Sequence, residues 1–132
     1  MTSDQEPTQP QRSATSAYID EAPRMEIEGR GVSFGLINQT MGARNLAVHL
    51  NVLRPNTVGP YHYHADAEDV YIVLAGTGRI LIEGEEHIVG PDQVMFIPPG
   101  LKHSVSNPGP GLLKLIEIYS PPAHPHDFHL AE

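Results

Sequence analysis

From Gly31 onward the chain is a series of short apolar segments, each ending in glycine, proline or asparagine within a few residues. These segments are rich in β-branched and aromatic residues, and they read GVSFGLI, NLAVHLNVL, VYIVLAG, GRILIEG, EHIVG, QVMFIPPG, HSVSNPG and LLKLIEIYSPP. Their lengths are those of β-strands, and the residues between them favour turns. No long stretch has the apolar spacing of an amphipathic helix. The pattern predicts an all-β sandwich or barrel and leaves the strand order open.

The chain of 132 residues is long enough for one domain with a core and too short for two. Residues 1–17 contain much Gln, Ser, Thr and Pro and almost no apolar side chains, so we predict a disordered arm. Residues 18–122 form the single folded domain, and residues 123–132 form a tail. The tail contains three histidines, His124, His126 and His129. Histidines spaced by proline near a terminus are more typical of a flexible extension than of a second metal site.

The sequence contains no cysteine, which excludes disulfides, thiolate metal ligands and a cysteine nucleophile. A metal ion would need histidine and carboxylate ligands, which favours Fe, Mn, Ni, Cu or Zn. Acidic residues outnumber basic ones 16 to 8, and no Lys/Arg cluster is present, so nucleic acid and anionic membrane are poor partners. No apolar run approaches the roughly 18 residues of a membrane span, and the N-terminus does not resemble a secretory signal. We therefore expect a cytoplasmic protein.

The segment HYHADAE, residues 62–68, is the clearest indication of chemistry. Side chains two apart in a strand face the same side, so His62 and His64 project together. If the chain reverses at Asp66, Glu68 returns opposite His64 as a cross-strand neighbour. Two imidazoles and a carboxylate would then converge, as in metal sites that keep open coordination positions.

A fourth candidate ligand is His103, which follows the segment PPGLK. The two prolines and the glycine indicate a rigid turn, and His103 opens the strand that leaves it. A stiff turn fixes where the next strand begins, which a preorganised site requires.

Two stretches resemble the paired motifs of the cupin family. Residues 55–76, PNTVGPYHYHADAEDVYIVLAG, are similar to the first motif, G-x5-H-x-H-x3-E-x6-G, and the positions matched to it are His62, His64, Glu68 and Gly76. Residues 92–107, DQVMFIPPGLKHSVSN, are similar to the second motif, G-x5-P-x-G-x2-H-x3-N, and the positions matched to it are Pro98, Gly100, His103 and Asn107. Asn56 and Asp92 replace the opening glycines, and both residue types tolerate left-handed turn geometry.

The resemblance covers about residues 45 to 119 and implies a double-stranded β-helix, the jelly-roll barrel of cupins. It also implies one divalent first-row metal ion inside the barrel. The implied ligands are His62, His64, Glu68 and His103. Glu68 is also the implied catalytic base, because a carboxylate can leave a metal ion and accept a proton.

The resemblance implies a metal-dependent enzyme acting on a small oxygenated metabolite, with oxygenase chemistry as the preferred reading. The alternative is a redox-neutral isomerase, cyclase, dehydratase or decarboxylase acting on a sugar, an organic acid or a polyketide. A third reading is a cupin that binds a small molecule without turnover, since a fold does not fix a function. A homodimer formed through the apolar segment from Tyr18 to Leu36 is the expected assembly.

Several polar residues could line the interior. His49 and Asn51 alternate on one predicted strand and either line the cavity or face solvent, and base rates for polar residues favour solvent. For four more residues the sequence does not show whether the side chain points into the barrel or toward solvent: Arg54, Arg79, Lys102 and Glu117.

Overall fold

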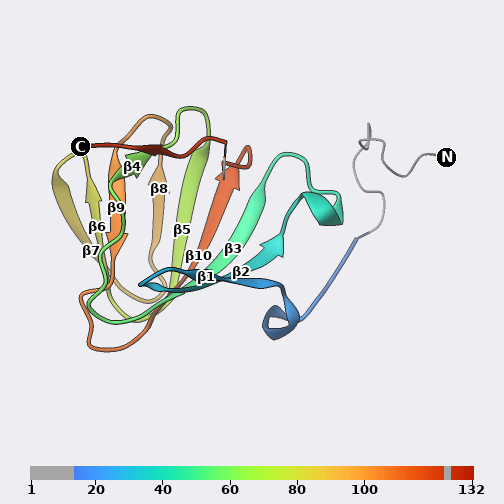
Figure 1. Ribbon diagram of the computed structural model, residues 1–132, viewed down its shortest axis with the longest axis horizontal. Coiled ribbons are helices and arrows are strands. Elements are labelled where there is room, and N and C mark those ends of the chain that lie inside the picture. Colours follow the sequence, from blue (N-terminus) through green and yellow to red (C-terminus); the bar gives the residue numbers. More distant parts are fainter. Residues whose placement is uncertain (1–13, 124–125) are drawn as a thin grey trace.

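The computed structural model describes residues 14–123 and 126–132 and confirms the all-β prediction (Figure 1). Two short 3-10 helices, η1 (Ile19–Glu21) and η2 (Gln39–Met41), accompany eleven strands in these ranges. Most of the predicted N-terminal arm and His124 of the tail lie outside the described residues. Among the described residues, no helix is long and apolar enough to cross a membrane.

The strands form two antiparallel sheets that face each other (Figure 1). The larger sheet has, in spatial order, β1 (Arg24–Ile27), β2 (Gly31–Ile37), β3 (Ala47–Leu53), β10 (Leu113–Ser120), β5 (Glu68–Ala75) and β8 (Val94–Ile97). The smaller sheet has β11 (His129–Leu130), β4 (His62–Tyr63), β9 (His103–Ser106), β6 (Gly78–Ile82) and β7 (Glu85–Val89). Neighbours in space are mostly distant in sequence, as in a jelly roll. The expected dimer contact through Tyr18 to Leu36 stays a prediction.

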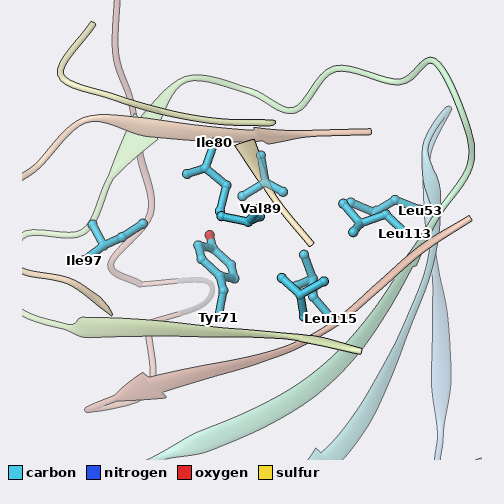
Figure 2. Packing of buried hydrophobic residues seen from close by; sticks show 9 residues of the cluster. Leu53, Tyr71, Ile80, Val89, Ile97, Leu113 and Leu115 are labelled. Carbon is cyan, nitrogen blue, oxygen red and sulfur yellow. The ribbon is translucent and has the colours of Figure 1, made fainter. Parts of the chain in front are cut away.

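An apolar core fills one end of the space between the sheets (Figure 2). Its fully buried members include Leu53, Ile80, Ile97, Leu113 and Leu115. The two-residue period of a strand places alternate side chains of β10 inside, and these inward positions change from apolar to polar along the strand. Leu113 and Leu115 belong to the core, whereas Glu117 is a buried carboxyl group. The polar interior therefore begins where the core ends.

Two turn positions have the geometry expected from the sequence. Asn56 has a φ of 61° and Asp92 a φ of 71°, so both residues adopt the left-handed conformation. Asparagine and aspartate tolerate this region better than most residues, which explains how the turns form without the glycines of the motifs.

Asn107 joins three parts of the chain at the core end of the barrel. Its side-chain amide Nδ2 donates to the backbone oxygens of Leu53 and Gly111, each at 2.9 Å. Its Oδ1 accepts from the backbone nitrogen of Gly109 at 2.8 Å. The side chain is almost fully buried, so these groups would have no alternative partner in water.

Replacing Asn107 with alanine should therefore destabilise the fold. We expect Asn107→Ala to lower the free energy of unfolding by about 2–4 kcal/mol, because it leaves buried backbone groups unpaired. Urea denaturation measures this change. The exposed Asn45 provides a control, and Asn45→Ala should change the value by less than about 0.5 kcal/mol. Equal effects of the two substitutions would contradict the assigned role.

Candidate metal centre

Three histidines meet inside the barrel, on the side of the smaller sheet. His62 on β4 and His103 on β9 are direct cross-strand partners, and His64 is the first residue after β4. All three are buried, and each offers one ring nitrogen to a group whose members lie within 4.8 Å of one another. The structure thus brings together the three histidines predicted from the sequence, and their group is able to hold a metal ion.

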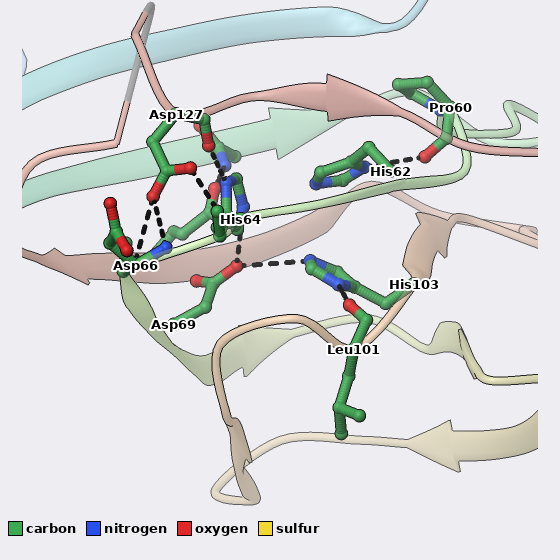
Figure 3. A network of polar contacts seen from close by, with 12 residues as sticks. Pro60, His62, His64, Asp66, Asp69, Leu101, His103 and Asp127 are labelled. Carbon is green, nitrogen blue, oxygen red and sulfur yellow. Dashed lines mark hydrogen bonds and ion pairs between the residues drawn. The ribbon is translucent and has the colours of Figure 1, made fainter.

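Each histidine is oriented by a hydrogen bond from Nδ1 to a backbone oxygen (Figure 3). His62 is bonded to Pro60 at 2.9 Å, His103 to Leu101 at 2.8 Å, and His64 to Asp127 at 2.7 Å. A carbonyl oxygen can only accept, so Nδ1 carries the proton in each ring. The lone pair is then on Nε2, which is the form in which an imidazole binds a metal.

Asp69 completes the group of polar atoms. Its carboxylate is fully buried, and its Oδ2 lies 3.4 Å from Nε2 of His64 and 3.3 Å from Nε2 of His103 (Figure 3). None of these atoms has a hydrogen-bond partner in the described part of the chain. Unpaired buried polar atoms are costly, and a metal ion would satisfy them. The ring nitrogens of the three histidines lie within 4.8 Å of one another, and the Asp69 carboxylate lies beside two of them. The residues present therefore fit a metal ion.

Glu68, the predicted fourth ligand and base, does not lie with the histidines. It is exposed, whereas its neighbour Asp69 faces inward, as alternation along β5 requires. The expected hairpin is absent because β5 belongs to the larger sheet, where Glu68 pairs with Ser120 rather than with His64. The sequence contained a signal for Asp69. Six residues separate it from Gly76, as the first motif requires, whereas seven separate Glu68 from Gly76.

The electrostatic environment differs among the group. Burial lowers the pKa of His62 to about 4, and the adjacent His103 and His64 contribute to the decrease. Burial would also lower the pKa of His64, but contact with the Asp69 carboxylate and the bond to Asp127 raise it above its ordinary value. Burial opposes ionisation of Asp69, yet the imidazoles of His103 and His64 hold its pKa below the usual range. The site therefore favours an ionised carboxylate beside imidazoles.

A cavity of about 380 Å³ extends from His62 between the two sheets. Its polar wall comes mainly from the larger sheet, and its members include Ser33, His49, Asn51, Tyr71, Glu117 and Tyr119. The preference for solvent-facing His49 and Asn51 was therefore wrong, because β3 turns these side chains toward the interior. The size of the cavity suits a small molecule.

Glu117 is the buried carboxyl group of this wall. The Asn51 side-chain amide donates to its Oε1 at 3.0 Å. Burial raises the pKa of Glu117 well above its ordinary value, and the nearby Asp69 carboxyl adds to the effect. Burial likewise raises the pKa values of Tyr71 and Tyr119, which contact Glu117. Burial therefore favours the protonated, uncharged form of all three side chains.

The other three residues whose side-chain orientation the sequence left open do not line the cavity. Arg54 is 3.7 Å from Glu26, Arg79 is 2.8 Å from Glu86, and the side chain of Lys102 is exposed. Of the four, Glu117 alone lines the cavity.

Comparison with known proteins identifies the family. The model of the cupin domain matches residues 49–119, which is more than half of the chain. The chain belongs to the cupin family. The double-stranded β-helix implied by the motifs is therefore confirmed, and the described residues form one small cupin domain.

The chain is similar to curated proteins and to solved structures whose names describe different functions. It is 42% identical over 59 residues to mannose-1-phosphate guanylyltransferase of Salmonella montevideo, which covers 45% of this chain and only 12% of that protein. It is 26% identical over 117 residues to the HTH-type transcriptional regulator PuuR of Escherichia coli K12, covering 89% of this chain and 60% of the regulator. The polyketide cyclase RemF from Streptomyces resistomycificus has the same fold, with a TM-score of 0.79 at 18% identity over 91% of this chain and 87% of RemF.

The placement of the two neighbouring carboxylates leads to a direct test. Asp69→Asn should weaken metal binding by at least about tenfold, because the group loses its buried charge, whereas Glu68→Gln should leave it unchanged. Metal content after dialysis against a weak chelator, measured by elemental analysis, distinguishes the variants. Loss of metal from Glu68→Gln and its retention in Asp69→Asn would instead support Glu68 as the carboxylate ligand, as predicted from the sequence.

His62 should make the metal-free protein sensitive to acid. Its pKa is about 4 in the folded state and near 6.5 in the unfolded chain, so the unfolded chain binds the extra proton between these values. The free energy of unfolding should therefore fall by about 3 kcal/mol as the pH decreases from 6.5 to 4, with no contribution above that window. Urea unfolding with chelator present, for wild type and His62→Gln, measures this dependence. Parallel profiles for the two proteins would contradict it.

Proposed function

We propose that this cupin is a metal-dependent enzyme that catalyses a redox-neutral proton transfer on a small oxygenated metabolite, as in an isomerisation, cyclisation or dehydration. One observation carries the proposal. His62, a member of the histidine group able to hold a metal ion, lines the same cavity as three buried side chains whose protonated forms burial favours, namely Glu117, Tyr71 and Tyr119.

A divalent ion held by the three histidines and Asp69 would polarise a carbonyl or hydroxyl oxygen of the substrate and make a neighbouring proton more acidic. The protein itself supplies the groups that hold and move protons. Burial favours the protonated form of the Glu117 carboxyl group, and the Asn51 amide fixes the orientation of that group through Oε1. Apolar side chains on the cavity wall, such as Leu115 and Phe128, exclude water from the substrate.

This proposal replaces the preference for an oxygenase. The same ligands would serve dioxygen chemistry, so the ligands do not distinguish the two reactions. The cavity wall favours the redox-neutral reaction, because buried groups whose protonated forms are favoured are suited to general acid–base steps.

Binding without turnover is the second candidate function. The similarity to PuuR, which is named as a transcriptional regulator and not as an enzyme, extends over 89% of this chain and supports a role without catalysis. The same cavity would then be a ligand site.

A screen in deuterium oxide tests the proposal. The metal-loaded protein is incubated with sugars, sugar phosphates, hydroxy acids and polyketide-like phenols, while mass spectrometry follows deuterium incorporation and an electrode follows dioxygen. We expect deuterium exchange or isomerisation without dioxygen consumption. Glu117→Gln should reduce the rate by about 100-fold or more, whereas Glu86→Gln, on the exposed face of β7, should not.

Two results would overturn the proposal. Dioxygen consumption coupled to product formation would establish an oxygenase. Saturable binding of a metabolite, with neither exchange nor dioxygen uptake for that compound, would establish a binding domain.

A further inference from the structure

We propose that residues 127–131, here called the strap, form a positioning element of the metal centre that holds His64 in its ligating orientation. This inference rests on the metal-binding part of the proposed function. The strap runs along the outer edge of the smaller sheet, where β11 pairs with β4. The tail expected to be flexible therefore packs beside the segment that contains His62 and His64.

The three histidines differ in what orients them. Nδ1 of His62 and of His103 is bonded to the backbone oxygen of a residue two positions earlier in the same segment. Nδ1 of His64 is instead bonded to the backbone oxygen of Asp127, which is 63 residues away in sequence (Figure 3). Only His64 among the three thus depends on a remote segment for its orienting bond.

The Asp127 side chain holds the loop that joins two members of the metal centre. Its Oδ1 accepts from the backbone nitrogen of Ala65 at 2.7 Å. Its Oδ2 accepts from the backbone nitrogens of Asp66 and Ala67 at 2.9 and 3.0 Å. These three residues lie between His64 and the start of β5, which carries Asp69. One carboxylate therefore sets the path of the chain from one candidate ligand toward the next.

Neighbouring residues of the strap attach it to the barrel. The ring of Phe128 stacks on the His62 imidazole with centroids 4.5 Å apart and an interplanar angle of 23°. His129 donates from Nε2 to Asp127 at 3.0 Å and stacks on Tyr63. The backbone nitrogen of Ala131 donates to Tyr61 at 2.9 Å. These contacts reach Tyr61, His62 and Tyr63, the three residues that directly precede His64.

A metal ligand that loses its outer hydrogen-bond partner typically binds metal 10–100-fold more weakly. Removing the strap should therefore weaken metal binding and release the proton of His64 to either ring nitrogen. His62 and His103 keep their local carbonyl partners and should retain their tautomers.

The test uses full-length wild type, Asp127→Ala, Asp127→Asn and a chain ending at Ala123. Cobalt binding is measured by visible absorption with a competing chelator, and circular dichroism monitors the fold. We expect about 10–100-fold weaker binding and altered cobalt bands for the chain ending at Ala123, which lacks the Asp127 carbonyl that orients His64. Asp127→Ala keeps this carbonyl but loses the bonds to the loop, so its loss of affinity should be smaller. Asp127→Asn keeps one acceptor oxygen and should lose least. Asp66→Ala removes an exposed carboxylate from the same loop as a matched control and should change affinity by less than about twofold.

Nitrogen-15 NMR of the imidazoles in the metal-free protein provides a second readout. Wild type should show His64 protonated at Nδ1, and the shortened chain should show a mixture of tautomers at His64 with His62 and His103 unchanged. An unchanged His64 tautomer or an unchanged cobalt affinity in the chain ending at Ala123, with its fold retained by circular dichroism, would overturn the role of the strap. If that chain does not fold, an unchanged cobalt affinity in Asp127→Ala would overturn it. A wild-type protein that binds no cobalt would instead overturn the proposed function, and the NMR result would still decide the role of the strap.

Discussion

The interior of this protein depends on a buried carboxylate and two buried imidazoles whose facing atoms contact one another at 3.3–3.4 Å without a hydrogen bond. Burying His64, His103 and Asp69 removes them from water, and within the described residues their facing atoms form no hydrogen bond. The barrel tolerates this arrangement because Nδ1 of each imidazole has a carbonyl partner. The Nδ1 atom of each ring therefore has a hydrogen-bond partner, and the Nε2 atom remains available for an ion.

The two sheets contribute differently to this arrangement. The smaller sheet supplies the three histidines, which lie on or beside neighbouring strands β4 and β9. The larger sheet supplies Asp69 from β5 and the acidic wall from β10, where inward positions change from leucine to glutamate within one strand. Closing one sheet over the other thus brings a group able to hold an ion near a wall whose buried side chains favour their protonated forms, and neither sheet contains both.

Much of this could be predicted from the sequence, because local patterns carried the information. Strand-length apolar segments predicted the all-β fold, and the two motifs found His62, His64 and His103. The carboxylate was assigned one residue too early, since a hairpin was assumed where the chain crosses to the other sheet. The inward facing of Asn51 and the packing of the strap depend on contacts between distant segments, which a single sequence does not display.

The strap also has a consequence for the order in which the protein is made. All three histidines and Asp69 have been added to the chain by residue 103, but the carbonyl that orients His64 belongs to residue 127. A nascent chain halted between these points would contain every candidate ligand without a complete centre. With the proposed role of the strap, metal loading would depend on synthesis of the segment that contains Asp127, and incomplete chains would compete poorly for scarce ions.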